Sequence, residues 1–373
     1  MPNSSPPYST WVEVDLQAIR DNVRWIVEHS GVAVMAVVKA DGYGHGSVPV
    51  ARAALQGGAT WLGVSRIEEA LELRNAGIAA PILVLGYLSN GFLEHAIQSD
   101  ISLTVWSPKH IEEIELCARQ LGRRASVHLK IDSGMGRIGA FPQEAGAIAK
   151  QLARAKHLVW EGVYTHFARA DENDPAPTQR QLQRFCDALE KMRPYLPTSL
   201  RIHAANSAAT LNYKEALFNM VRIGIAMYGL NPSPDRPLPP VFKPALSWKT
   251  VLSHVKIVPP GEGISYGHAY VTQTNERIGT LPVGYADGFR RVPGNMVLIK
   301  GKKVPVVGRV CMDQCMVQLD GVPEAEVGDE VVLIGKQGGQ QITADEVAGL
   351  WSTINYEVIC GIGRRVPRIY LNL

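Results

Sequence analysis

The sequence has few cysteines, and they form no recognisable metal or disulfide set. Its 373 residues include five, an odd number with no Cys-x-x-Cys pair: Cys117, Cys186, Cys311, Cys315 and Cys360. Such spacing indicates neither a disulfide framework nor a zinc cage. Because no set of His, Asp and Glu ligands stands out either, we expect no metal.

Long apolar runs and a strong excess of one charge are also lacking. No stretch approaches the ~18–20 apolar residues that cross a bilayer, and residues 1–10 are polar and proline-rich rather than signal-like. The formal net charge is only +3 and no Lys/Arg-rich run is present. We therefore expect neither a membrane nor a nucleic-acid partner. These absences favour a reduced, cytoplasmic enzyme that acts on a small molecule.

Short apolar runs alternate with helix-length amphipathic segments through about the first 230 residues. Helical periodicity marks segments such as 67–76, 108–120, 142–155 and 178–192. Eight strands with intervening helices favour a (β/α)8 TIM-type barrel, although a doubly wound open sheet has the same alternation. The eight runs are Val32–Val38, Trp61–Val64, Ile82–Leu85, Ile101–Val105, Ser126–Ile131, Val159–His166, Leu200–Ala204 and Met220–Ile225.

The character of the sequence changes after Asn231. Residues 231–244 carry six prolines and are typical of a linker. The short alternating strands beyond it indicate a smaller, mostly antiparallel β domain. We therefore predict an α/β plus β protein, with a barrel in residues 1–240, a β domain in residues 241–373, and a first strand at about residues 10–15 that pairs with the β domain. The predicted elements of this domain are strands Ala245–Val258, Arg277–Pro282, Met296–Lys300, Lys303–Val310, Met316–Leu319 and Glu330–Ile334, and a helix Thr343–Trp351.

The stretch from Val38 to Gly46 combines a lysine at a strand end with a glycine-rich loop. Lys39 closes the first apolar run, and three glycines fall within the five residues from Gly42 to Gly46, around Tyr43. A lone lysine at such a place more often only extends its amine to solvent. Glycines let backbone approach a ligand closely, and a lysine beside such a loop is the arrangement expected of a Schiff-base nucleophile.

Polar residues gather at the predicted C-terminal strand ends, where barrel enzymes carry their active sites. Ser207 and the backbone amides of Gly224 and Ile225 offer a phosphate cradle after the last two strands. Taken singly, such a serine is usually a helix N-cap, and an isolated histidine such as His166 is more often structural. A Schiff-base lysine and a phosphate cradle in one barrel together point to pyridoxal phosphate. The strand-end residues are Lys39, Lys130, Asp132, Arg137, His166, Asn206, Ser207, Arg222 and Gly224.

The chain resembles the bacterial alanine racemases, pyridoxal phosphate enzymes of fold type III, over nearly its whole length. The segment Ala36–Gly46 is similar to that family's cofactor-lysine signature. The resemblance implies the same two domains, a homodimer with shared active sites, alanine as substrate, and a role in making D-alanine for peptidoglycan precursors. Agreement continues through Lys130–Gly139, Arg222–Gly229, Gly261–Tyr266, Leu281–Gly288, Gly308–Asp313 and Ile354–Arg368.

The same resemblance implies a role for each matching residue. Lys39 would hold the cofactor through a Schiff base and act as the base on one face of the substrate. Tyr266 would be the base on the other face, supplied by the partner subunit. Lys130 matches a position that is carbamylated in several members; the alternative is an ordinary strand-end lysine paired with Asp132. The other residues implied are Tyr43, Leu85, Asn206, Ser207, Gly224, Ile225 and Tyr356 for the cofactor and its phosphate, Arg222 at the pyridine nitrogen, His166 beside Arg222, Arg137 and Met312 for the substrate carboxylate, and Tyr285 and Asp313 at the entrance.

Elementary chemistry agrees with this assignment. Racemisation removes a proton from Cα on one face and returns one on the other, so it needs two bases in reach of the same carbon. A phenol such as Tyr266 is a poor base unless cations favour its anion. The resemblance implies that His166 and Arg222 provide that positive charge indirectly.

Three other functions fit the sequence less well than alanine racemisation does. A basic amino-acid decarboxylase of this fold would have a carboxylate where Arg222 stands. A serine or broad-specificity racemase differs only in pocket size, and the bulky Tyr356 favours a small substrate; a pocket distinguishes one methylene by only about 1–3 kcal/mol. A non-catalytic pyridoxal phosphate-binding protein would lack the β domain that carries Tyr266.

Overall fold

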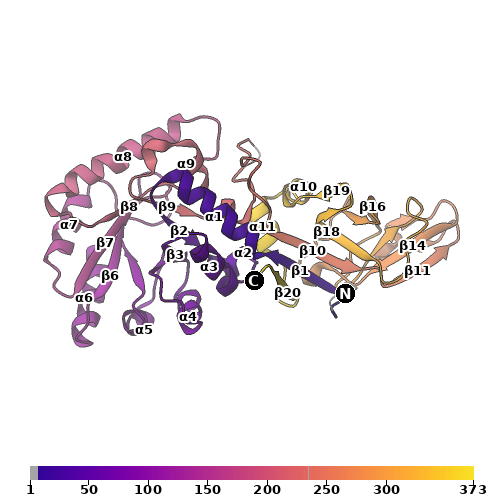
Figure 1. Ribbon diagram of the computed structural model, residues 1–373, viewed down its shortest axis with the longest axis horizontal. Helices are drawn as coiled ribbons and strands as arrows, with labels where there is room; N and C mark the ends of the chain where they lie inside the picture. The colour runs from indigo at the N-terminus through magenta and orange to yellow at the C-terminus, as the bar shows by residue number, and fades with distance from the viewer. Residues whose placement is uncertain (1–6, 234) are drawn as a thin grey trace. The chain divides into compact units, whose positions relative to one another are not determined.

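The computed structural model describes residues 7–233 and 235–373 (Figure 1), and it divides into two compact units. The barrel unit is Ala18–Lys243, and the β unit joins the described residues up to Gln17 with Pro244–Leu373. The sequence placed this boundary at residues 240/241. Residues 1–6, part of the segment for which we predicted no secretory signal, lie outside the described residues.

The barrel unit contains eight parallel strands in one nearly closed sheet, which confirms the predicted fold class (Figure 1). The strand order is β8-β7-β6-β5-β4-β3-β2-β9, and backbone hydrogen bonds cross the seam from Arg222 N to Ala205 O (3.0 Å) and from Asn219 N to Ile202 O (3.4 Å). The strands are β2 Ala33–Val37, β3 Trp61–Val64, β4 Ile82–Val84, β5 Ser102–Val105, β6 Ala125–Lys130, β7 Leu158–Tyr164, β8 Arg201–His203 and β9 Met220–Ile223.

Helices cover the outside of this sheet (Figure 1), which is why the strands are apolar on both faces. Ser107 caps one of them by accepting a hydrogen bond from His110 N, and Pro108 occupies its first turn. The helices are α1 Leu16–Ser30, α2 Lys39–Tyr43, α3 Ser47–Gln56, α4 Ile67–Asn75, α5 Leu93–Gln98, α6 Pro108–Gln120, α7 Ala145–Arg154, α8 Ala176–Met192 and α9 Ser207–Asn212, with short 3-10 turns η1 Asn90–Phe92, η2 Arg193–Tyr195, η3 Lys214–Ala216 and η4 Ile225–Tyr228.

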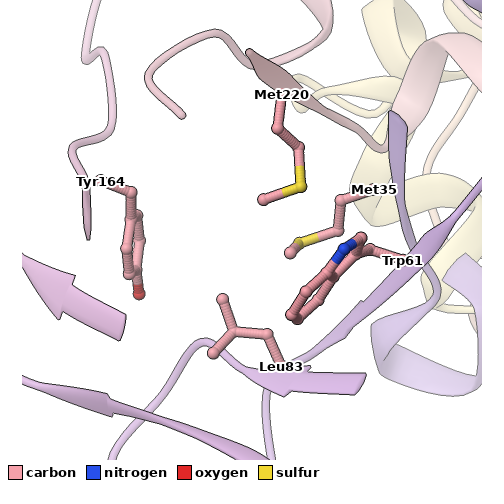
Figure 2. Close-up of a cluster of buried hydrophobic side chains, with 5 residues drawn as sticks. All are labelled: Met35, Trp61, Leu83, Tyr164 and Met220. Atoms are coloured by element: carbon pink, nitrogen blue, oxygen red, sulfur yellow. The ribbon is translucent and has the colours of Figure 1, made fainter. Parts of the chain in front are cut away.

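Large side chains fill part of the barrel interior. Figure 2 shows Met35, Trp61, Leu83, Tyr164 and Met220, from five different strands, converging on one another. All five are buried. Because these side chains occupy the barrel interior, the residues that bind or react with a ligand are expected at the strand ends.

The β unit is built on a sheet in the order β11-β14-β17-β16-β15-β18-β10-β1-β20, with β19 pairing β18. As expected, the first strand, β1, lies in this sheet, antiparallel to β10 and parallel to β20. The strands are β1 Thr10–Asp15, β10 Leu246–Val251, β11 His254–Val258, β14 Glu276–Leu281, β15 Met296–Ile299, β16 Lys302–Val307, β17 Cys315–Gln318, β18 Glu330–Gln337, β19 Gln340–Ile342 and β20 Arg368–Leu371; a separate hairpin pairs β12 Gly263–Ile264 with β13 Tyr270–Val271.

The predicted single strand Ala245–Val258 was wrong. The run is divided at Leu252 and Ser253 into β10, which pairs with β18, and β11, which pairs with β14 at the opposite edge of the sheet. Ser253 donates both its backbone N–H and its hydroxyl to Thr280 O (2.9 Å each), so the chain changes partner there.

The sequence also left some elements of this unit unpredicted. They are the hairpin β12–β13, the strands β19 and β20, the helix α11 Asn355–Cys360, and the turns η5 Tyr266–His268 and η6 Tyr285–Asp287; the predicted helix near Thr343 is α10 Ala344–Leu350. In the part of the chain that the structure describes, no helix combines the length and apolar character needed to cross a membrane.

Candidate functional site

The backbone that follows Lys39 is a left-handed turn. Ala40 has φ 53° and ψ 51°, Asp41 has φ 53° and ψ 50°, and Tyr43 has φ 53°, with Gly42 and Gly44 also at positive φ. Left-handed conformation costs a non-glycine residue roughly 1–2 kcal/mol. The glycines alone do not explain the left-handed conformation of Ala40, Asp41 and Tyr43, so contacts from outside the turn must stabilise it.

Arg222, in β9, is buried and pinned by five hydrogen-bond acceptors. Nη1 donates to His203 O (2.8 Å) and Nδ1 (3.0 Å), and Nη2 donates to Thr165 O (2.7 Å), Ala204 O (3.1 Å) and His166 Nδ1 (3.2 Å). Burial lowers the pKa of Arg222 to about 10, so the guanidinium stays charged at neutral pH.

Because a guanidinium only donates, both histidine Nδ1 atoms must accept. Burial and the nearby Arg222 hold the pKa values of His166 and His203 well below the usual range, so both rings are neutral and carry their proton on Nε2. His203 Nε2 then donates to His128 Nδ1 (3.0 Å). The orientation of Arg222 is thus coupled to a buried chain of side chains inside the barrel.

Cations accumulate at this end of the barrel. Lys130, at the end of β6, is buried, and its pKa falls to about 7 through burial and then through Arg137, Arg222 and Lys39. Both Lys130 and Arg222 lie over the ring of Tyr164, at 5.4 and 5.2 Å from its centre. So much positive charge suits an anionic ligand.

Asp132 has a different task from pairing with Lys130. Its carboxylate accepts backbone N–H bonds from Gly134, Met135 and Gly136 at 2.9–3.1 Å, and so shapes the loop that carries Arg137. Arg137 itself is exposed at the surface of the unit.

Ser207, Gly224 and Tyr43 form a small polar cradle. Ser207 Oγ accepts from Gly224 N (3.1 Å) and Ala226 N (3.4 Å). A Cβ on Gly224 would lie 2.5 Å from the Tyr43 hydroxyl, so only glycine allows the tyrosine to approach this closely. Hydroxyls and backbone amides gathered in this way suit a phosphate group.

The remaining barrel residues have identifiable neighbours. Asn206 caps α9 by accepting from Ala209 N (3.0 Å), so the structure gives its side chain a capping task. Leu85 follows β4 and its carbonyl accepts from the Tyr164 hydroxyl (3.3 Å). Ile225 begins the turn η4.

Tyr266 lies in the β unit, where its side chain is 67% exposed in the turn η5. Ser265, at φ 67°, fixes this turn by donating from Oγ to Arg309 O (2.6 Å). Tyr266, Met312 and Asp313 line one cavity of about 690 Å³, so the fold brings these predicted residues together. The other lining residues are Ser265, Gly267, His268, Cys311 and Gln314.

Tyr285 is tied to the same wall, because its N–H donates to Cys311 O (3.0 Å) and the next residue donates to Met312 O (3.0 Å). Arg365 pairs with Asp313 (2.6 Å) and with Asp287 (2.7 Å). Tyr356 lies in α11.

Several residues that hold the candidate side chains within each unit were not predicted from the sequence. In the barrel unit His203 contacts Arg222 and His128, and in the β unit Arg365 contacts Asp313, in each case across distant segments of the chain. Both histidines stand inside predicted strands, Ser126–Ile131 and Leu200–Ala204, and a polar residue at such a place was the available signal. Among residues 7–233 and 235–373, no group of three His, Cys, Asp or Glu side chains is arranged to hold a metal ion.

Comparison with known proteins agrees with this architecture. Family models described as the N-terminal and C-terminal domains of alanine racemase match residues 14–232 and 245–370. The alanine racemase of Symbiobacterium thermophilum is 50% identical over 97% of each chain, and that of Geobacillus stearothermophilus is 49% identical over 97% of this chain and 93% of its own.

Solved structures give the same result. The alanine racemase of Bacillus anthracis with bound L-Ala-P superposes with a TM-score of 0.92 at 46% identity, covering 99% of this chain and 96% of the other. The enzyme from D-cycloserine-producing Streptomyces lavendulae has a TM-score of 0.93 at 40% identity, covering 99% and 98%. From its sequence, fold and relatives, the chain belongs to the alanine racemase family of isomerases.

Proposed function

We propose that this enzyme interconverts L- and D-alanine with pyridoxal 5'-phosphate bound in the barrel unit. The observation that carries the proposal is the cationic strand-end cluster of Lys39, Lys130 and Arg222 beside the cradle of Ser207 and Gly224. A cluster of this charge next to hydroxyl groups and backbone amides fits an anionic cofactor and an amino-acid carboxylate. The family membership supports the same reaction.

The residues present fit this cofactor. Lys39 would hold it through a Schiff base and Arg222 would donate to its pyridine nitrogen, with Leu85, His166 and Asn206 around it. When bound, pyridoxal phosphate supplies a conjugated ring that withdraws electrons from the amino-acid Cα and so acidifies its proton. The phosphate would be held by Tyr43, Ser207, Gly224, Ile225 and Tyr356.

Two bases of the protein would then move the proton. Lys39 Nζ takes it from or returns it to Cα on one face, and the Tyr266 hydroxyl does so on the other. We assign Tyr266 to the site of the partner subunit, so that the homodimer completes two sites. Tyr285 and Asp313 line the entrance.

The histidine beside Arg222 would assist the tyrosine. His166 is neutral and accepts from Arg222 at Nδ1, which leaves Nε2–H able to donate. A hydrogen-bond donor that is itself bonded to a cation stabilises a phenolate acceptor. His166 would therefore lower the free-energy cost of deprotonating Tyr266 of the partner subunit.

Arg137 and the Met312 amide would orient the substrate carboxylate. Lys130, with its pKa of about 7, has a neutral amine that can attack carbon dioxide and release a proton, and the resulting carbamate would place a carboxylate within the cation cluster to brace Arg137. Such a carboxylate would also offset the positive charge that accumulates at this end of the barrel.

Optical rotation tests the proposal directly. Purified protein supplied with pyridoxal phosphate should abolish the rotation of L-alanine, act more slowly on L-serine, and leave L-lysine unchanged. Loss of rotation with lysine but not alanine would contradict the substrate assignment. We place the reaction in the cytoplasm, as a source of D-alanine for peptidoglycan precursors.

A further inference from the structure

Glu69 reaches the left-handed turn that follows Lys39. Glu69 lies in the first turn of α4, and one of its carboxylate oxygens, Oε1, accepts the backbone N–H of Ala40 at 2.6 Å. The other oxygen, Oε2, accepts from Ser65 N (2.7 Å) and Arg66 N (3.0 Å). A single carboxylate therefore joins the start of α4 to the residue directly after Lys39.

The Ser65 and Arg66 contacts alone resemble those of a helix capping box, and helix stability is enough to explain them. The Ala40 contact is different because it spans 29 residues and satisfies an N–H at the start of the turn. A charged acceptor makes the shorter and stronger kind of hydrogen bond.

The turn needs such support. Ala40, Asp41 and Tyr43 all have positive φ although none is glycine. Within the turn, Asp41 Oδ1 accepts from Ser47 N (3.0 Å) at the start of α3. The two carboxylates thus tie the turn to α4 and to α3, with Lys39 directly before it and Tyr43 within it.

We propose that Glu69 is a positioning residue that holds this left-handed turn, and thereby the Lys39 amine relative to Tyr43. The proposal rests on the role assigned to Lys39 above. Glu69 touches no reacting atom; it acts through the Ala40 N–H.

Glu69→Gln is the informative variant. In the wild type, three backbone N–H groups donate to the two carboxylate oxygens of Glu69. The glutamine side chain has only one oxygen, so its NH2 group must face at least one of these N–H donors, and that hydrogen bond is lost. Glu68→Gln is the matched control, because Glu68 is an exposed neighbour in the same first helical turn and carries the same charge.

The first readout is amide hydrogen exchange of the peptide 39–46, measured with and without added pyridoxal phosphate. We expect at least tenfold faster exchange in Glu69→Gln and no change in Glu68→Gln. This readout requires no turnover, so it tests the turn even if the proposed reaction is wrong. Wild-type inactivity toward alanine would refute the reaction alone.

The second readout is kinetic. In Glu69→Gln we expect kcat to fall at least tenfold with KM for alanine changed less than threefold. Adding Ala40→Gly should restore much of kcat, because glycine adopts this conformation without steric cost. Loss through the capping box alone would not be rescued by a change at residue 40.

Unchanged exchange in 39–46, or a kcat defect that Ala40→Gly does not relieve, would overturn the proposal. If Glu69→Gln does not fold, Glu69→Asp replaces it. That variant keeps the charge at the start of α4 but is one methylene shorter, so it should show the same local exchange and the same rescue.

Discussion

At the scale of single residues, the proposed mechanism gives Tyr266 and the two lysines, Lys39 and Lys130, distinct protonation tasks. Tyr266 is 67% exposed in its own chain, and its hydroxyl would serve as an acid–base group in the partner's site. Lys130 is buried among cations and has a pKa of about 7. Each assignment predicts a separate measurement.

Tyr266→Phe should lower kcat by about 10²–10⁴-fold, the usual contribution of a general acid–base group. The absorbance of bound cofactor should stay unchanged, because the Lys39 link remains. Exchange of the Cα proton with solvent should suffer more for one alanine enantiomer than for the other. Tyr87→Phe, at another exposed tyrosine, is the control; equal losses in both variants would remove Tyr266 from the mechanism.

The lowered pKa of Lys130 predicts that formation of its carbamate depends on pH. The neutral amine needed to form it is present above a pKa of about 7 and is lost below it. With 13C-bicarbonate, a carbamate carbonyl signal should appear in NMR spectra at pH 8 and disappear as the pH falls through 7. Lys130→Met should lack the signal at every pH, and a signal that survives in it would assign the carbamate elsewhere.

At the scale of elements, the ends of β8 and β9 and the turn after β2 build the cradle together. Ser207 opens α9 after β8, Gly224 follows β9, and Tyr43 ends α2. Packing sets the distance between Gly224 and Tyr43, because the Tyr43 hydroxyl leaves no room for a Cβ on residue 224.

Gly224→Ala should therefore weaken cofactor binding. The added methyl would lie 2.5 Å from the Tyr43 hydroxyl, and such overpacking costs about 1–3 kcal/mol, or roughly 5- to 150-fold in affinity if it falls on the bound state. The measurement is a titration with pyridoxal phosphate followed by absorbance. Gly91→Ala is the control, because nothing lies within 4 Å of the position that its added methyl would take; equal affinities in the two variants would argue against the cradle.

At the scale of the whole molecule, the proposed site needs residues from two chains. Lys39 belongs to the barrel unit and Tyr266 to the β unit. In the proposed homodimer, Tyr266 of each chain would complete the site around Lys39 of the other chain. The dimer would therefore contain two such sites related by symmetry.

Mixed dimers of Lys39→Ala and Tyr266→Phe chains test this. In a mixed dimer one site carries both changes and the other carries neither, so half of the sites are intact. Random 1:1 assembly makes half of the dimers mixed, which predicts about a quarter of wild-type activity from two nearly inactive parents. Separately tagged chains, co-expressed and purified through both tags, should reach about half. If each site were built within one chain, the mixture would stay inactive.

Much of the fold follows from the sequence because parallel strands buried on both faces are continuous apolar runs. Trp61–Val64 was predicted to the residue, and most of the others within a residue or two. The strand Ala245–Val258 failed because alternation continues through Leu252 and Ser253, and only the change of partner from β18 to β14 divides it.

The sequence by itself determined the lysine at a strand end, the glycines after it, the two-unit plan and the family. Tertiary structure alone decided the conformation of Ala40 and Asp41, the tautomers of His166 and His203, and the pKa of Lys130. These depend on acceptors and charges brought from distant segments, such as Glu69 and Arg222. Local sequence cannot encode them, because each is set by neighbours that meet only in the folded barrel.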